Sequence, residues 1–206
     1  MKLLILDLQV SNLFSIVNAV KYLGYNYIVD NTKKNIENSD CIIIPGVGSF
    51  PYAMRQLNKN KLNETLKKES NKGKPIIGIC LGFQLLFSKG EEFKITSGLD
   101  LVKGAVKILP TKKNLTVPHV GWSQLIDPNK NNNKFFDKND YFYFVHSFYV
   151  QPENKKIILS QTEYENFKFC SSIYHENIFG FQFHPEKSGR SGLNLLSKTL
   201  RYAEKI

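Results

Sequence analysis

Cysteine is scarce in this 206-residue chain, and its three cysteines lie far apart in the sequence. None of them forms a C-x-x-C pair, the spacing typical of zinc sites and redox motifs. So few cysteines also exclude a disulfide-stapled secreted scaffold. We therefore expect a protein of a reducing compartment, the cytoplasm, with no metal site and no cofactor.

Long apolar runs are lacking as well, which excludes a membrane-spanning helix. The first ten residues, MKLLILDLQV, carry only a short apolar run that Asp7 interrupts, and no small-residue cleavage site follows it. This pattern is typical of a first β-strand rather than of a secretion signal. No internal repeat is visible. With 42% hydrophobic residues the chain can fill one core, so we expect a single domain over residues 1–206.

Acidic residues are outnumbered, 18 against 28 basic ones, and the net charge is +10. Such a balance raises the question of a nucleic-acid partner. The excess is almost wholly lysine, however, scattered with asparagine along polar stretches such as NKNKLNETLKKESNKGK. Nucleic-acid binders concentrate their charge, often with arginine and interleaved aromatics. A solvated lysine surface is the better interpretation, and we expect no nucleic-acid partner.

The first half of the chain alternates apolar strand-like runs with helical patterns. This alternation predicts parallel βαβ units with helices on both faces of the sheet. The expected strands are 2–8, 25–29, 41–45 and 75–79. The expected helices run from Ser11 to Gly24, after residue 50, over about 60–71 and over 81–89.

The second half is rich in strand-like runs with few helices between them. The runs are 102–109, 141–150, 155–162, 167–174 and 178–183, before a final helix over about 189–203. The polar segment 128–140 is expected to be a loop. The predicted fold class is therefore α/β, a mostly parallel open sheet flanked by helices with an added antiparallel or mixed portion.

One cysteine stands in the pattern GICLG, with a glycine two places before and two places after Cys80. A nucleophile held in a sharp strand-to-helix turn needs small residues at those two places. At the start of a helix the free N–H groups and the dipole also favour the thiolate. A buried filler with incidental glycines is the plainer alternative. Cys41 and Cys170 lack this pattern, and for them the structural role is preferred.

A thiol nucleophile needs a base, and the base needs an orienting group. Of the four histidines, His184 directly follows an apolar run and has a carboxylate, Glu186, two residues on. Residues two apart in extended backbone point to the same side, so Glu186 can orient His184. His119, His146 and His175 lack this context. HPE alone is usually a loop with a surface acid; together with the elbow it favours a Cys-His-Glu triad.

The loop PGVGSF, residues 45–50, follows a predicted parallel strand, at the edge of the sheet where open α/β proteins gather their sites. Such a loop can direct backbone N–H groups at a developing oxyanion. By itself it is more simply a β–α turn.

These segments, in this order, resemble class I (triad-type) glutamine amidotransferases. The segments VPHVGWSQL and YFVHSFY and the run GFQFHPEKSG extend the resemblance to the glutaminase subunits of imidazole glycerol phosphate synthase, over nearly the whole chain. The resemblance implies hydrolysis of L-glutamine to glutamate and ammonia, with Cys80 as nucleophile, His184 as base and then acid, and Glu186 orienting it.

Further roles follow from the same resemblance alone. The oxyanion would be held by backbone N–H groups of the 46–48 loop and of the residue after the nucleophile, namely Gly46, Val47, Gly48 and Leu81. The family's loop needs a rearrangement to do so. The glutamine would be held by Gln84, His146, Ser147 and Phe148.

The family's subunit forms a heterodimer with a (β/α)8 synthase subunit, which receives the ammonia and makes imidazole glycerol phosphate and an aminoimidazole carboxamide ribotide in histidine biosynthesis. Positions resembling its interface are Asn12, Trp122, Tyr143 and Lys187. One stretch departs from the family, where DLQVSN replaces a pattern with two glycines. Gln9 and Ser11 stand at those glycine positions, near the expected docking edge.

Three alternatives remain open at the level of the sequence. A paralogous glutaminase subunit supplying ammonia to a sugar amidotransferase is suggested only by DLQVSN. A non-catalytic or nucleic-acid-binding protein on this scaffold is disfavoured by the intact triad and the dispersed lysines. A stand-alone cysteine hydrolase is disfavoured by the partner-facing segments.

Overall fold

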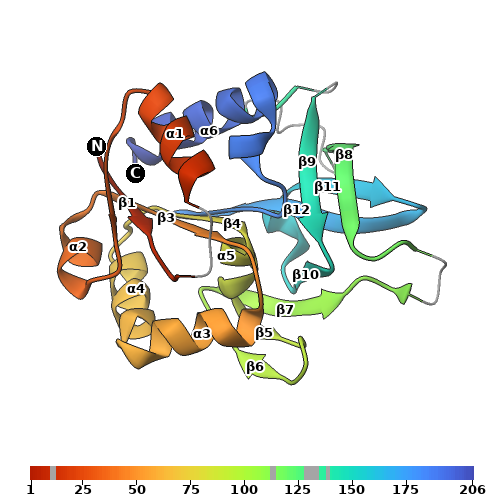
Figure 1. Cartoon of the computed structure of the whole chain (residues 1–206), viewed down its shortest axis with the longest axis horizontal. Helices are drawn as coiled ribbons and strands as arrows, with labels where there is room; N and C mark the ends of the chain where they lie inside the picture. Colours follow the sequence, from red (N-terminus) through yellow and green to blue (C-terminus); the bar gives the residue numbers. More distant parts are fainter. Residues whose placement is uncertain (10–12, 112–114, 128–134, 138–139) are drawn as a thin grey trace.

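A single large sheet forms the centre of the protein. The structure is a computed structural model that describes residues 1–9, 13–111, 115–127, 135–137 and 140–206. Within these residues the sheet has eleven strands, in the order β2-β1-β3-β4-β13-β12-β10-β7-β5-β6, with β11 paired to β12. A separate two-stranded ribbon is formed by β8 and β9. Both are visible in Figure 1.

The first four strands in this order, β2, β1, β3 and β4, form a parallel half of the sheet. It consists of β1 (Lys2–Leu6), β2 (Asn26–Asp30), β3 (Cys41–Gly46) and β4 (Ile76–Cys80). β3 and β4 are buried along their whole length, as expected of strands covered on both faces. Their side chains alternate between the two faces, because successive residues of a strand point to opposite sides.

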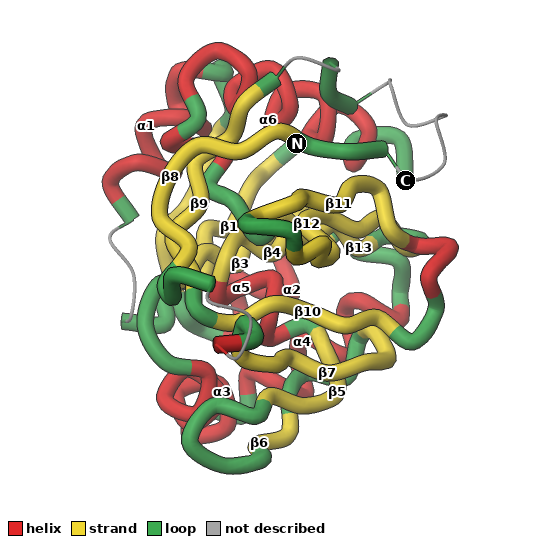
Figure 2. The backbone as a smooth tube through the Cα atoms, turned by 90° about the vertical axis from the view of Figure 1, so that its right-hand side faces the viewer, coloured by secondary structure: helices red, strands yellow, loops and turns green. Residues whose placement is uncertain are grey.

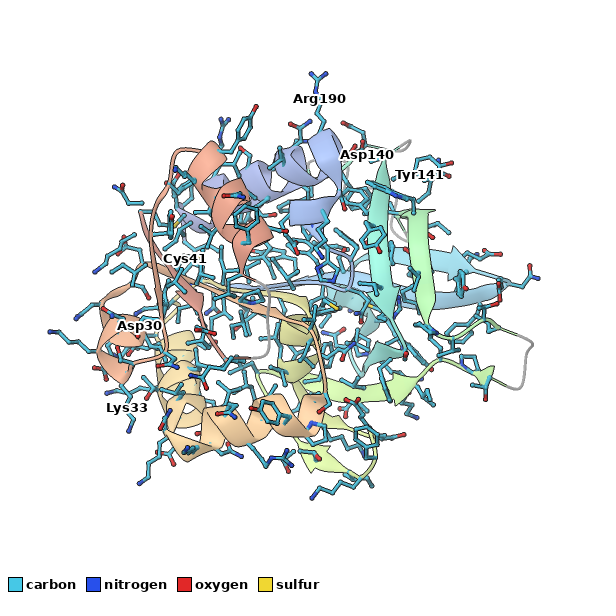
Figure 3. All side chains as sticks on the ribbon, in the orientation of Figure 1. Asp30, Lys33, Cys41, Asp140, Tyr141 and Arg190 are labelled. Atoms are coloured by element: carbon cyan, nitrogen blue, oxygen red, sulfur yellow. The ribbon has the colours of Figure 1, made fainter. Side chains whose placement is uncertain are left out.

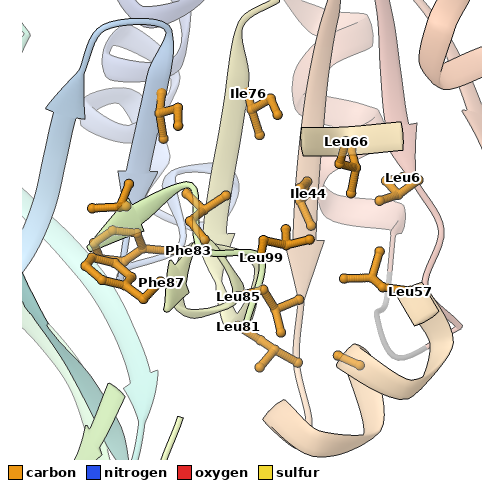
Figure 4. Close-up of a cluster of buried hydrophobic side chains, with 14 of the residues drawn as sticks. Leu6, Ile44, Leu57, Leu66, Ile76, Leu81, Phe83, Leu85, Phe87 and Leu99 are labelled. Atoms are coloured by element: carbon orange, nitrogen blue, oxygen red, sulfur yellow. The ribbon is translucent and has the colours of Figure 1, made fainter. Parts of the chain in front are cut away.

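Helices cover both faces of this parallel half (Figure 1). One face carries α1 (Phe14–Tyr22) and α6 (Gly189–Ala203), which pack on side chains such as Ile43 and Ile77. The other face carries α3 (Phe50–Lys59), α4 (Leu62–Asn71) and the short α5 (Leu81–Leu85). Figure 4 shows the second core, in which Leu57 and Leu66 from these helices meet Ile44 and Ile76 of the sheet. α2 (Lys33–Asn38) lies against α4.

The other half of the sheet is mostly antiparallel. β13 (Ile178–Phe181) joins the two halves, because it is parallel to β4 on one side and antiparallel to β12 on the other. The remaining strands are β12 (Phe167–His175), β11 (Ile158–Tyr164), β10 (Phe148–Pro152), β7 (Val102–Ile108), β5 (Phe87–Gly90) and β6 (Thr96–Ser97).

The ribbon consists of β8 (His119–Gln124) and β9 (Tyr141–His146), two antiparallel strands. It runs across the antiparallel half of the sheet, as Figures 1 and 2 show from two sides, and packs against β11 and α6. Alternate residues of β9 are buried, with Phe142 and Phe144 in the core and Tyr141 exposed. One face of the ribbon therefore belongs to the core and the other faces solvent.

The predicted fold class is confirmed, and the differences are local. The helix predicted over 81–89 is wrong beyond Leu85, because β5 begins at Phe87. The strand predicted over 141–150 is two strands that part at Ser147. β8 and α2 carry too little apolar periodicity to have been predicted. Of the first predicted helix, the Ser11 start lies outside the described residues.

The surface is consistent with the charge pattern of the sequence. Charged side chains such as Lys33 and Arg190 point outward from the backbone into solvent (Figure 3). Among the helices that the structure describes, none is long and apolar enough to cross a membrane.

One buried carboxylate lies near the edge of the sheet at which the parallel strands begin. The side chain of Glu69, on α4, is 4% exposed and receives Lys72 Nζ at 2.6 Å and Lys74 Nζ at 2.9 Å. Lys74 Nζ also donates to the carbonyls of Ile36 and Glu37 in α2. Burial by itself would raise the pKa of Glu69, but the two lysines outweigh burial and lower it. Its contribution to stability is present above the unfolded pKa of 4.5 and is lost as pH falls through the folded value.

The two lysines provide a matched pair of variants. Both lysines contact the same carboxylate, but the side chain of Lys74 is 10% exposed and that of Lys72 is 57% exposed. We expect Lys74→Met to lower the free energy of unfolding by about 2 kcal/mol, because it removes a buried charge partner and two carbonyl contacts. Lys72→Met should lower it by less than about 1 kcal/mol, as for other exposed pairs. Urea denaturation at neutral pH measures both.

The difference between the two variants should also narrow as pH falls from 4.5 through the lowered folded pKa of Glu69, where the native carboxylate takes up a proton. Equal losses for Lys72→Met and Lys74→Met at neutral pH would contradict this account of the network.

Candidate active site

Three neighbouring parallel strands bring the predicted residues to one edge of the sheet. In the register of β3 and β4, Gly46 lies opposite Cys80. In the register of β4 and β13, Ile79 lies opposite Phe181, so the chain passes His184 three residues later. The carboxyl ends of adjacent parallel strands meet at one edge, which explains why segments 46–48, 80 and 184 are neighbours.

Cys80 has a strained backbone, with φ 54° and ψ −110°. Positive φ is uncommon for a residue other than glycine, and it marks a position that the surroundings must hold in place. The glycines on either side permit this. A Cβ at Gly82 would lie 1.7 Å from the Ile44 carbonyl oxygen, and one at Gly78 would lie 2.7 Å from the Gly82 oxygen. Any side chain there would push β3, β4 and α5 apart.

The thiol of Cys80 is 5% exposed and has two polar neighbours. Cys80 Sγ lies 3.9 Å from the Val145 carbonyl oxygen of β9, and Gln182 Nε2 donates to the same sulfur at 3.9 Å. The other cysteines differ. Burial raises the pKa of Cys41 to about 12 and also raises that of Cys170, so both thiols stay protonated at neutral pH.

His184 and Glu186 are paired. His184 Nδ1 lies 2.7 Å from Glu186 Oε1, and both side chains are buried. Burial by itself would lower the pKa of His184. The nearby charge of Cys80 and the hydrogen-bonded Glu186 act in the opposite direction and raise this pKa to about 10.

The contact between His184 and the thiol is incomplete in this state. No described atom lies at hydrogen-bonding geometry to His184 Nε2, although Cys80 is close enough to raise the pKa of the imidazole. The electrostatic interaction of the two groups acts at distances beyond those of a formed hydrogen bond. With this pKa, His184 carries a proton at neutral pH.

The backbone of His184 is tied to the ribbon. His184 N donates to the Tyr143 carbonyl at 2.9 Å, and Tyr143 N donates to Ser188 Oγ at 2.9 Å. Ser188 Oγ donates in turn to the His184 carbonyl at 2.6 Å. The imidazole is thus positioned by β9 as well as by the end of β13.

A cavity of about 320 Å³ opens in front of Cys80. This volume is at the lower end of the range for small-molecule sites. Its lining contains eight of the predicted site residues, namely Val47, Gly48, Cys80, Leu81, Gln84, His146, Ser147 and Phe148. His184 and Glu186 are buried and are not part of the lining. Gly46 is also outside the lining, where a Cβ would lie 2.9 Å from Leu81 Cβ.

Two larger hollows, of about 720 and 730 Å³, lie elsewhere. Met1, Asp40 and Pro75 in the first precede their strands, so it opens at the opposite edge of the sheet. Neither hollow contains a member of the predicted triad. The smaller cavity is the candidate site because it contains the thiol of Cys80 and the other predicted site residues.

One lining residue, Glu92, was missed by the sequence analysis. It follows β5, and its Oε2 accepts a hydrogen bond of 2.6 Å from Phe50 N in the first turn of α3. Glu92 therefore brings a negative charge into the cavity. The only signal in the sequence is a pair of acids, Glu91 and Glu92, in a lysine-rich chain.

Three of the predicted interface residues, Trp122, Tyr143 and Lys187, lie on the ribbon or next to it. Trp122 is 55% exposed, and its ring is 5.8 Å from that of Tyr143. Lys187 is exposed at the end of the 3₁₀ turn Pro185–Lys187. Asn12 and Ser11 lie outside the described residues. Gln9, at the other position where the family has glycine, has a φ of 57° and donates from its N–H to Asp7 Oδ1.

No group of three or more potential metal-ligating side chains is assembled within the described residues. The site instead combines a buried thiol on a strained turn, a protonated imidazole, an orienting carboxylate and an acidic side chain across a small cavity. This set can carry out nucleophilic attack on a carbonyl carbon, followed by proton transfer to a leaving group.

Comparisons with known proteins agree with this chemistry. The model of the glutamine amidotransferase class-I family matches residues 4–201. Subunit HisH 2 of imidazole glycerol phosphate synthase from Vibrio vulnificus (strain YJ016) is 43% identical over 99% of this chain and 96% of its own length. The HisH subunit from Aquifex aeolicus (strain VF5) is 39% identical over 100% of this chain and 99% of its own.

Among solved structures, PurLQS from Thermotoga maritima matches with a TM-score of 0.72 and 20% identity, over 98% of both chains. A structure described as a glutamine amidotransferase matches with a TM-score of 0.74 and 15% identity, also over 98% of both chains. At these identities the two structures show the fold alone. The family match and the close relatives show more: the chain belongs to the class I glutamine amidotransferases, in the group of HisH subunits of imidazole glycerol phosphate synthase.

Proposed function

We propose that this chain is the glutaminase subunit of an imidazole glycerol phosphate synthase, hydrolysing L-glutamine in histidine biosynthesis with Cys80, His184 and Glu186. The observation that carries the proposal is a strained thiol at a small cavity, electrostatically paired with an imidazole that a buried carboxylate orients. His184 takes the thiol proton, and in the first step the sulfur attacks as thiolate at the side-chain amide carbon of glutamine while the C=O electron pair moves onto oxygen. As the C–N bond breaks, His184 gives its proton to nitrogen, and ammonia leaves.

The second half of the reaction releases glutamate. A γ-glutamyl thioester remains on Cys80, and His184 is now neutral. It accepts a proton from an attacking water, and collapse of the tetrahedral intermediate breaks the C–S bond. The sulfur leaves as thiolate next to a protonated His184, which restores the starting pair. Glu186 accepts at Nδ1 throughout and stabilises the imidazolium whenever His184 is protonated.

Substrate recognition is assigned to the cavity walls. Glu92 carries the charge that suits an α-ammonium group, and Gln84 and segment 146–148 line the same cavity. The backbone N–H groups of segment 46–48 and of Leu81 border the thiol and suit the oxyanion. Gly48, with φ 109°, provides a point at which this loop can turn.

A partner is part of the proposal. The expected acceptor of ammonia is a (β/α)8 synthase subunit, bound as a heterodimer on the solvent face of the ribbon. Trp122 is half exposed on that face, with Val120 and Tyr141 also exposed there, and contiguous apolar side chains of this kind suit a protein–protein contact. Because Tyr143 holds the His184 backbone, a partner on the ribbon would act close to the base.

The first test concerns the nucleophile and the base. Cys80→Ser and His184→Ala should each abolish glutamate release in the assembled enzyme, by three or more orders of magnitude, because triad members act as a unit. Cys41→Ser and Cys170→Ser serve as matched thiol controls and should retain most of the activity. Glu186→Gln should lose less than His184→Ala, because it only orients. Normal turnover by Cys80→Ser would overturn the proposed mechanism.

The second test concerns Glu92. Replacement by glutamine keeps the shape and an acceptor for Phe50 N but removes the charge that would meet the α-ammonium group. We expect the KM for glutamine to rise by about tenfold or more, the scale of one charged hydrogen bond, with a smaller change in kcat. Glu91→Gln is the adjacent control and should leave the KM unchanged. An unchanged KM in Glu92→Gln would move the ammonium site elsewhere.

The third test concerns coupling to the partner. Glutamine hydrolysis by the purified chain alone should be slow, because release of ammonia without an acceptor is wasteful and the 46–48 loop is expected to reorient. Addition of the synthase subunit, and then of its ribotide substrate, should raise the rate in steps; a coupling of about 1–3 kcal/mol suffices for a two-state loop. Full activity of the chain alone would contradict this. Activation only by a sugar-modifying partner would favour the paralogue alternative.

A further inference from the structure

Two buried histidines of the ribbon form a hydrogen-bonded line that the triad does not use. His119 Nε2 lies 3.1 Å from Ser123 Oγ, and His119 Nδ1 lies 3.1 Å from His146 Nε2. His146 Nδ1 lies 2.8 Å from the carbonyl oxygen of Phe148. The line therefore runs from β8 through β9 to the proposed glutamine-binding segment 146–148.

The direction of every bond in this line follows from its last member. A carbonyl oxygen can only accept, so His146 Nδ1 carries the hydrogen. The Nε2 of neutral His146 is then an acceptor and needs the hydrogen of His119 Nδ1. His119 Nε2 is in turn an acceptor, and Ser123 donates to it. Both imidazoles are thereby fixed in the Nδ1–H form, with one arrangement of hydrogens and no alternative.

The Phe148 carbonyl is also the end of a second line, which leads to the thiol. Gln84 Nε2 donates to this carbonyl at 3.1 Å and to Gln182 Oε1 at 3.2 Å. The amide of Gln182 then donates to Cys80 Sγ at 3.9 Å. One carbonyl in the glutamine cavity is therefore held from two sides, by the histidine line and by the line from the nucleophile.

The surroundings of the histidines are apolar. His119 is 1% exposed, between the stacked rings of Phe144 at 4.9 Å and Tyr164 at 4.0 Å. Burial lowers the pKa of His119 to about 4 and that of His146 to about 3, so both are neutral at physiological pH. A phenylalanine would fill such a place without the cost of burying two polar rings. The hydrogen bonds, rather than the ring volume, distinguish histidine here.

We propose that His119 is a positioning residue for glutamine: with Ser123 and His146 it fixes the Phe148 carbonyl, and thereby the segment that binds the substrate. The inference rests on the proposed function of segment 146–148. It also gives the ribbon a connection to the substrate site, because β8 carries His119 on its core face and Trp122 on its solvent face.

Steady-state glutaminase kinetics of the complex with the synthase subunit test this role. His119→Leu leaves His146 Nε2 buried without a donor, and we expect the KM for glutamine to rise about tenfold while kcat changes less than about threefold. His119→Asn keeps a donor near the position of Nδ1 and should recover most of the affinity. Phe144→Leu disturbs the packing on the same ring but no bond of the line; it should lower the melting temperature and leave the KM unchanged.

Two kinetic outcomes would overturn the proposal: an unchanged KM in His119→Leu, or a KM in His119→Asn as high as in His119→Leu. Should His119→Leu fail to fold, ¹⁵N NMR of the wild-type imidazoles decides. Both rings should be in the Nδ1–H form near neutral pH, and an Nε2–H form of either one would refute the line. Absence of any glutamine hydrolysis by the wild-type complex would instead refute the proposed function, and the NMR result is independent of it.

Discussion

The approach of Gly82 to the carbonyl of Ile44 is the constraint on which the site depends. It allows α5 to start directly against β3, and this in turn holds Cys80 at a φ that a cysteine does not adopt by preference. Once the turn is fixed, the thiol, the 46–48 loop and the first residue of α5 have little freedom relative to one another. The strain at one residue is stabilised by two large cores, one on each face of the sheet.

The features of this site that can be predicted from the sequence are those that depend on short motifs of a few residues. The G-x-C-x-G spacing, the apolar runs and the His-x-Glu pair each depend on backbone geometry over a few residues, and such geometry has a fixed period. The parallel half of the sheet, the buried status of Cys41 and the pairing of Glu186 with His184 are therefore predictable from the sequence alone.

The remaining features depend on contacts between distant segments. The place of β13 in the middle of the sheet is set by its pairing with β4, about a hundred residues earlier in the chain. Glu92 enters the cavity because its loop folds back onto α3, and a single acid has no periodicity to reveal this. α5 ends early because the chain must leave for β5, a tertiary requirement that overrides helix propensity.

The position of β13 has a consequence for synthesis of the protein on the ribosome. The strand that leads to His184 is also the strand that links the two halves of the sheet, and it is made about a hundred residues after β4. While these residues are made, the nascent chain carries its nucleophile with neither its base nor a closed sheet, since β4 and β12 have no strand between them. Premature termination before this strand would yield a fragment with an exposed sheet edge and a thiol that has no base. We expect such a fragment to be degraded by quality-control proteases and not to hydrolyse glutamine.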